Sequence, residues 1–289
     1  MDQRRRADLD AQLRHVRERD EMRDRDSNGW AEWIPKQDDG IIHLIDMDIS
    51  NEVMARFAEG LAMAFEANPE LKLTEMFLGG GNPFGDEGLS SLANVFGRFP
   101  RCRETLETLS LMSNRNITTI KPLAEAGTFE ALTSLNVSGC SISSVPPQLD
   151  MTQLEVFDVS DNSSIVFPEE LLLALPKDCG VRLSITRGVY VMRESFTGGK
   201  KEYHRWYVKL TDKFGGASFR TTLTVREICE QAGVDYHTMV KPARTMLRCE
   251  TCLAPRPAYM CGDCKQKVYC GKACQEKHWS SHLPFCKLK

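Results

Sequence analysis

The sequence predicts a mixed α/β protein: a solenoid of repeated strand-containing units, then a small β-hairpin and helix segment, then a compact cysteine-rich module. Three observations lead to this prediction. Apolar residues recur at a repeated spacing between positions 41 and 176, polar and apolar residues alternate after position 181, and seven of the eleven cysteines lie between Cys249 and Cys286. The predicted parts are a charged arm, a repeat region, a basic hairpin and helix region, and the cysteine-rich module: 1–30, 41–180, 181–247 and 249–286.

Composition places the chain among ordinary folded proteins, with 42% hydrophobic and 27% charged residues in 289. No apolar run approaches the roughly 20 residues that a membrane span requires. The N-terminal arginines are not followed by an apolar segment, so we expect no secretory signal and residence in the cytoplasm and/or nucleus. The net charge of −3 is uneven, because residues 181–289 hold 20 Lys/Arg against 9 Asp/Glu.

Residues 1–30 form a highly charged arm with eight arginines and eight acidic residues. Leu9, Leu13 and Val16 fit one face of a helix, and the pattern fails at Asp20. We therefore expect a short exposed helix or a disordered arm. A dimerising coiled coil is disfavoured because it needs three or four sustained heptads.

Residues 41–176 contain a repeated pattern, apolar-x-x-apolar-x-apolar, often followed by Asn or Cys. The alternation of the last two apolar positions predicts a short strand with one buried face. Where the chain leaves the strand, Asn114, Cys140 and Asn162 are expected to hydrogen-bond the backbone. The first apolar positions of the five units, 29, 33, 26 and 22 residues apart, are Leu44, Leu73, Leu106, Leu132 and Leu154.

The segments between the strands change along the chain. Apolar residues recur at helical spacing in 52–67 and 89–96, which predicts two helices. The segment 141–148 is too short and too rich in proline for a helix. Gly79–Gly81 lacks the Lys-Ser/Thr of a phosphate-binding loop, so a turn is predicted there.

The repeats resemble the leucine-rich repeat family. Asn82, followed by Gly85-Asp86 and Gly88 at the start of a helix, is similar to the ribonuclease-inhibitor type of unit. The resemblance implies a horseshoe whose strands line a concave face, a frequent binding surface, so we expect a second protein partner there. The expected concave positions are Asp46, Asp48, Glu75, Phe77, Thr108, Ser110, Ser134, Asn136, Val156 and Asp158.

Residues 181–247 predict a hairpin and a helix. Gly188–Ser195 and Tyr203–Leu210 alternate in polarity and are joined by a Gly-rich turn at 197–200. A third strand is expected at Ser218–Leu223. Thr224, with Glu227 three residues later, forms a capping-box signature for a helix that ends at Gly233.

The same region is basic, with Tyr203, Trp206 and Tyr207 interleaved among the charges. Basic residues with stacking aromatics can bind single-stranded nucleic acid through 181–248. The alternative is a half-buried strand with a solvated basic face. We disfavour nucleic acid because no fold-specific motif accompanies these residues.

The C-terminal cysteines form pairs with the spacing of metal ligands. Thiolate and imidazole are the usual ligands of structural zinc, and C-x2-C places two sulfurs on one ion. Eight ligands suffice for two closed tetrahedral sites and leave no position for water, so the two Zn²⁺ ions are expected to be structural. Spacing permits sequential or interleaved pairing. The candidate ligands are Cys249, Cys252, Cys261, Cys264, Cys270, Cys274, His282 and Cys286.

This spacing resembles the MYND finger family, most closely over the segment from Tyr269 to Cys286. The resemblance selects His282 over His278 as the eighth ligand. It also implies interleaved sites, with Cys249, Cys252, Cys270 and Cys274 on one ion and Cys261, Cys264, His282 and Cys286 on the other.

The resemblance also implies a function, because MYND fingers bind proline-rich protein segments, often Pro-x-Leu-x-Pro. The resemblance implies that Gln275 and Trp279 contact such a peptide beside the strand at 267–269. An exposed indole can stack on proline, and a strand edge can accept an extended peptide. The alternative is that Trp279 packs inside the finger.

These features predict a non-enzymatic adaptor. Some MYND proteins resemble SET-domain lysine methyltransferases, which is the alternative, but the Asn-His-Ser-Cys type of motif is absent and the finger lies at the C-terminal end. The other four cysteines lack ligand-like spacing and are expected to be small buried apolar residues: Cys102, Cys140, Cys179 and Cys229.

Overall fold

The computed structural model of the chain describes residues 3–184, 189–197, 200–208 and 220–234, together with 259–260, 268–269, 272–277 and 279. The chain divides into two compact units, Met1–Val234 and Asp235–Lys289, and each is described by itself. None of the helices in the described ranges is long and apolar enough to cross a membrane.

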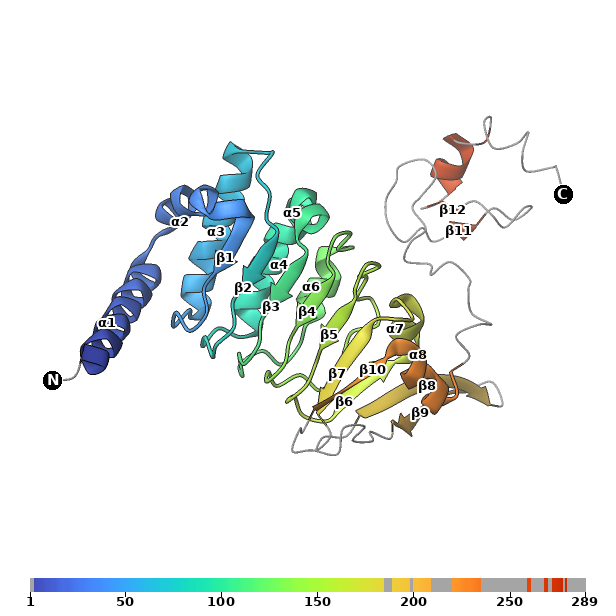
Figure 1. Cartoon of the computed structure of the whole chain (residues 1–289). Coiled ribbons are helices and arrows are strands. Elements are labelled where there is room, and N and C mark those ends of the chain that lie inside the picture. The colour runs from blue at the N-terminus through green and yellow to red at the C-terminus, as the bar shows by residue number, and fades with distance from the viewer. Residues whose placement is uncertain are drawn as a thin grey trace. The chain divides into compact units, whose positions relative to one another are not determined.

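The first unit is built on a seven-stranded sheet (Figure 1). Its first six strands are parallel to their neighbours and follow one another in chain order, and the seventh strand is antiparallel. This is the sheet that the repeated spacing predicts. The strands in order are β1 (Ile41–His43), β2 (Glu75–Phe77), β3 (Thr108–Ser110), β4 (Ser134–Asn136), β5 (Val156–Asp158), β7 (Gly180–Ser184) and β10 (Arg220–Thr224).

Helices follow the early strands and cover one face of the sheet (Figure 1). The predicted helix 52–67 is α3 (Asn51–Ala67), and the predicted helix 89–96 is the longer α4 (Asp86–Arg98). Three shorter helices are α5 (Pro100–Thr105), α6 (Lys121–Ala126) and α7 (Glu169–Ala174). The segment 141–148 forms no helix, as expected. The central residue of each of the first five strands faces the helices and is fully buried: Ile42, Met76, Leu109, Leu135 and Phe157.

The first and third residues of the strands lie on the other face, which we call the open face. Eight of the ten expected positions, from Glu75 to Asp158, are confirmed by the strand register. The expectation for the first repeat was wrong, because Ile41 pairs with Glu75 and His43 pairs with Phe77. Asp46 and Asp48 instead follow β1 with positive φ angles of 56° and 55°.

The error in the first repeat has a simple cause. The register places Asp39 at the position that Leu73 occupies in the second repeat, so the first repeat has no leading leucine. Leu44 is therefore the last apolar position of its repeat and not the first. The strand begins three residues before Leu44, and the open-face positions are Ile41 and His43.

A column of polar side chains runs through the turns after the strands. Each side chain donates a hydrogen bond to the carbonyl oxygen of the last apolar strand position in the preceding unit, which confirms the role predicted for Asn114, Cys140 and Asn162 and extends it to Asn82. The four bonds are Asn82 Nδ2 to Leu44 O at 2.8 Å, Asn114 Nδ2 to Leu78 O at 2.9 Å, Cys140 Sγ to Leu111 O at 3.3 Å, and Asn162 Nδ2 to Val137 O at 2.8 Å.

One residue just before this column has a left-handed backbone in every unit. It lies two positions after the last apolar strand residue, and its φ angle is between 56° and 81°. At Gly80 a side chain is excluded as well, because a Cβ there would lie 2.7 Å from the backbone nitrogen of Asp46. The predicted glycine turn is thus one member of a repeated series: Asp46, Gly80, Ser113, Gly139 and Asp161.

The hairpin predicted after position 181 is present. Strand β8 (Val189–Thr197) is antiparallel to β9 (Lys200–Tyr207), and β8 is also parallel to β6 (Ile165–Pro168), which makes a separate three-stranded sheet. The third strand of the region, β10, lies two residues later than expected at its start and pairs with β7. The main sheet therefore continues past residue 180.

The helix predicted after Thr224 is α8 (Val225–Ala232). Both hydrogen bonds of the capping box with Glu227 are present, and Gly233 follows in the left-handed conformation with φ 64°. The local signature alone was sufficient here, because the cap bonds join residues only three positions apart.

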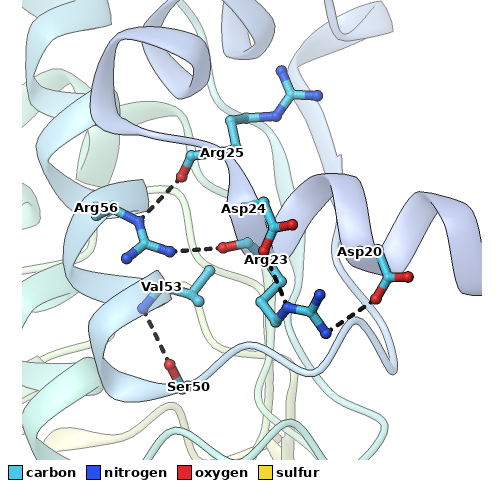
Figure 2. Close-up of polar contacts among 7 residues, drawn as sticks. All are labelled: Asp20, Arg23, Asp24, Arg25, Ser50, Val53 and Arg56. Carbon is cyan, nitrogen blue, oxygen red and sulfur yellow. Dashed lines mark hydrogen bonds and ion pairs between the residues drawn. The ribbon is translucent and has the colours of Figure 1, made fainter.

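The charged arm is helical, and its helix is longer than the short helix expected. Helix α1 (Gln3–Asp24) is followed by α2 (Ser27–Trp33) and a short 3-10 turn, η1 (Ile34–Lys36). Figure 2 shows how α3 holds the end of α1: Arg56 donates to the carbonyl oxygens of Arg23 at 2.6 Å and Arg25 at 3.1 Å. Trp30 of α2 is fully buried and contacts Phe57 edge-on at 5.1 Å between ring centroids.

We expect Asn82→Ala to lower the free energy of unfolding by about 2–4 kcal/mol, because it leaves buried backbone groups without partners. The Asn82 side chain is 2% exposed, donates to Leu44, Leu78 and Gly79, and accepts from the amides of Met47 and Ile49.

Urea unfolding monitored by circular dichroism measures the change. Asn94→Ala, an exposed asparagine on α4, is the matched control and should leave the midpoint almost unchanged. Equal effects of the two substitutions would contradict the role given to Asn82.

Candidate functional site

The described part of the second unit contains a two-stranded antiparallel ladder and a short helix. Strand β11 (Tyr259–Met260) pairs with β12 (Val268–Tyr269), which covers most of the strand predicted at 267–269. Tyr269 is fully buried, and residues 272–277 are helical. The two strands end directly beside Cys261 and Cys270 in the sequence, so the ladder links two of the predicted ligand pairs.

Cys274 is the one predicted metal ligand within the described residues, and it lies half-buried on the helix 272–277. The other seven predicted ligands lie outside these residues, as does His278. Within the described ranges no group of three or more His, Cys, Asp or Glu side chains gathers. The donor set itself, seven thiols and one imidazole, is the type that zinc prefers.

Gln275 and Trp279, the predicted peptide contacts, are both half-buried and both helical in backbone. They are four residues apart, a spacing that places two side chains on the same face of a continuous helix.

Comparison with known families gives an independent identification of this unit. Residues 241–286 match the model of the MYND finger. The match spans all eight predicted ligands as well as Gln275 and Trp279. A search of curated proteins gave no significant match to the chain. The chain therefore carries a MYND finger near its C-terminus, a type of zinc-binding module that mediates protein–protein interaction.

The four cysteines outside the finger have a different environment. Burial raises the pKa of the Cys102, Cys140 and Cys179 thiols to about 12 and that of Cys229 to about 11. Their thiols therefore keep the proton at neutral pH, which a nucleophile or metal ligand must lose. For Cys140 the retained proton is the one donated to the carbonyl of Leu111. All four side chains are buried, as the sequence predicts.

The open face of the first unit is the second candidate surface, and its C-terminal half satisfies its own polar groups. Asn136 accepts hydrogen bonds from the amide and hydroxyl of Ser138, and Asp158 does the same with Ser160. Asp158 also lies 3.7 Å from the guanidinium of Arg182. This half offers few uncommitted groups to a ligand.

The N-terminal half of the open face has a different character that the sequence pattern did not indicate. Ile41 and His43 replace the acidic residues expected there, and Ile45 and Met112 extend the same face at its edge. The missed signal was the absent leading leucine of the first repeat. Only the correct register pairs Ile41 with Glu75 and His43 with Phe77.

We expect the four buried thiols to remain unreactive toward Ellman's reagent at pH 8 while the first unit is folded, because their raised pKa values keep them protonated and burial excludes the reagent. Chelator-treated native protein should react at no more than seven thiols, and protein in guanidinium chloride at eleven, the total in the sequence. Rapid reaction of more than seven thiols before unfolding would contradict this expectation.

Proposed function

We propose that the protein is a non-enzymatic adaptor with two protein-binding modules. The C-terminal MYND finger holds two structural zinc ions and binds proline-rich protein segments, and a leucine-rich-repeat horseshoe supplies a second protein-binding surface. The observation that carries the proposal is the match of residues 241–286 to the MYND finger, which spans all eight candidate ligands.

The proposed zinc sites are interleaved. One ion is held by the first and third ligand pairs, and the other by the second and fourth. An unmetallated module of about 40 residues buries too little apolar surface to fold alone, so the ions take over the role of a core. Closed coordination by four protein ligands leaves no open position for a substrate, which supports a structural role. The two sets are Cys249, Cys252, Cys270 and Cys274, and Cys261, Cys264, His282 and Cys286.

The proposed peptide contacts are Gln275 and Trp279. The partial exposure of both side chains supports a role at the surface. The indole of Trp279 can stack on a proline ring, and the Gln275 amide can bond the backbone of an extended peptide. Such a peptide would lie beside β12, as strand addition requires.

The proposed leucine-rich repeats rest on three observations in the first unit. The parallel strands follow chain order, and each of the first five turns has a left-handed residue two positions after the last apolar strand residue. An Asn or Cys in each turn from the second to the fifth bonds the preceding repeat. Repeats of this kind leave the strand face open for a partner. The open face is the proposed second binding surface.

The proposal includes no catalytic step. The methyltransferase alternative would require a SET domain, whose Asn-His-Ser-Cys type of motif the sequence lacks. Nucleic-acid binding through 181–248 is not favoured by a specific contact. The finger contributes little to it, because thiolates offset most of the positive charge of its lysines, arginines and zinc ions. We propose residence in the cytoplasm and/or nucleus.

We expect purified protein to contain two zinc ions per chain, and His282→Ala to lose about one of them and to weaken the finger, because a tetrahedral site loses a ligand. Atomic absorption after gel filtration measures the metal content.

His278→Ala is the matched control and should retain both ions. Loss of zinc from the His278 variant but not from the His282 variant would overturn the assignment of the eighth ligand.

A labelled peptide that contains Pro-x-Leu-x-Pro should bind the zinc-loaded chain, and Trp279→Ala should weaken it by about tenfold or more, since buried aromatic anchors dominate small interfaces. Fluorescence anisotropy measures the affinity. Glu276→Ala, an exposed neighbour on the same helix, controls for a general effect on the finger. Equal affinity of wild-type and Trp279→Ala protein would remove Trp279 from the binding surface.

A further inference from the structure

We propose that the N-terminal half of the open face is a docking surface for an extended basic peptide that carries apolar side chains. This inference rests on the proposed function, because it names the kind of partner for the second binding surface. The surface, which we call the aromatic patch, consists of Ile41, His43, Ile45, Phe77 and Met112.

The rings of the aromatic patch lie on β1 and β2, and Met112 follows β3 on the same side of the sheet. His43 of β1 and Phe77 of β2 are paired in register, and their rings stack with centroids 4.7 Å apart and planes at 16°. His43 is exposed and Phe77 is half-buried, so the stacked pair presents a ring surface to solvent. Ile41 precedes this pair on the same face of β1.

The edge of the patch is formed by two of the most exposed large apolar side chains in the described residues, Ile45 at 44% and Met112 at 41%. The glycine turn lies between them. A Cβ at Gly79 would be 2.6 Å from Met112 Cγ, and a Cβ at Gly80 would be 2.8 Å from Ile45 Cγ2. The missing side chains leave room for Ile45 and Met112 to lie against the turn, one on each side of it.

Exposed apolar area of this kind is not needed to hold the sheet together. The opposite face of the same strands is filled by fully buried residues, among them Ile42, Met76 and Leu109. Apolar and aromatic side chains that gather on the solvent side of the sheet are typical of a surface that another molecule covers.

Charge around the patch selects the kind of molecule. Glu75 lies between Ile41 and Thr108 in the strand register. Asp39 and Glu107 lie exposed where the chain enters β1 and β3. None of these three carboxylates has an ion-pair partner within the described part of the chain. Lys72, exposed just before β2, offsets one of these charges.

An acidic border around stacked rings fits a cationic and apolar partner. An arginine guanidinium can stack on the exposed ring surface of His43 and Phe77 while it pairs with the carboxylate of Glu75. Aliphatic side chains of the same peptide would cover Ile45 and Met112. Nucleic acid and anionic lipid are disfavoured here, because the uncompensated carboxylates repel phosphate.

The test uses the full chain and fluorescein-labelled 12-residue peptides, with binding measured by fluorescence anisotropy at low and moderate salt. The probe alternates Arg and Leu, and two comparison peptides alternate Glu with Leu and Arg with Ser. We expect the Arg/Leu peptide to bind at least about tenfold more tightly than either comparison peptide, because charge and apolar contact are both required. Its affinity should fall as salt is raised.

Single substitutions then locate the site. Glu75→Gln and Met112→Ser should each weaken the Arg/Leu peptide by about fivefold, and Glu75→Gln should also reduce the salt dependence. The matched controls are Glu125→Gln on α6 and Val16→Ser on α1. The exposed fraction of Val16, 40%, is similar to the 41% of Met112. The urea midpoint of each variant verifies folding.

The proposal is overturned if the Glu/Leu peptide binds as tightly as the Arg/Leu peptide, or if the patch variants bind like their controls. Trp279→Ala separates this result from the finger: it should leave Arg/Leu binding intact while it weakens proline-rich binding. If the Arg/Leu peptide binds and the Pro-x-Leu-x-Pro peptide does not, the proposal for the finger is wrong. If only the Pro-x-Leu-x-Pro peptide binds, the proposal for the aromatic patch is wrong.

Discussion

The first unit depends on how buried backbone groups are satisfied at the end of each strand. The carbonyl of the last apolar strand residue lies where water cannot reach it, and leaving it without a donor would cost free energy in every unit. A side chain of the next unit supplies the donor, as Asn162 does for Val137. This bond ties each turn to the preceding repeat, directly after the left-handed residue of the turn, and acts together with the backbone ladder that holds the strands in register.

The same constraint leaves one face of the sheet unoccupied. Because each repeat uses its central strand residue to build the core, together with a helix in the early repeats, the first and third strand residues are left on the other face. At the C-terminal half the third strand residues accept hydrogen bonds from the turns that follow, as Asp158 does from Ser160. At the N-terminal half the uncommitted residues are apolar, aromatic and acidic. The second unit follows a different principle, since a finger of this size is stabilised by ligand–metal bonds in place of an apolar core.

Local patterns predicted much of the first unit correctly. The helices α3 and α4, the β8–β9 hairpin and the capping box of Thr224 all involve residues close together in the sequence. Errors arose where a strand was defined by a distant partner. Pairing with β2, more than 30 residues away, decides which residues form β1. Strand β10 likewise pairs with the distant β7 and not with the nearby hairpin.

The sequence by itself determined the type of the C-terminal module, because metal ligands must be spaced to reach one ion, and that spacing is visible in the chain from Cys249 to Cys286. It also determined which side chains in the turns would bond the backbone. Only the tertiary structure decided which residues share the open face. Ile45 and Met112 are far apart in the chain, and each lies against the glycine turn, Met112 at Gly79 and Ile45 at Gly80. Their proximity depends on the register of three stacked units, a non-local property that no single segment encodes.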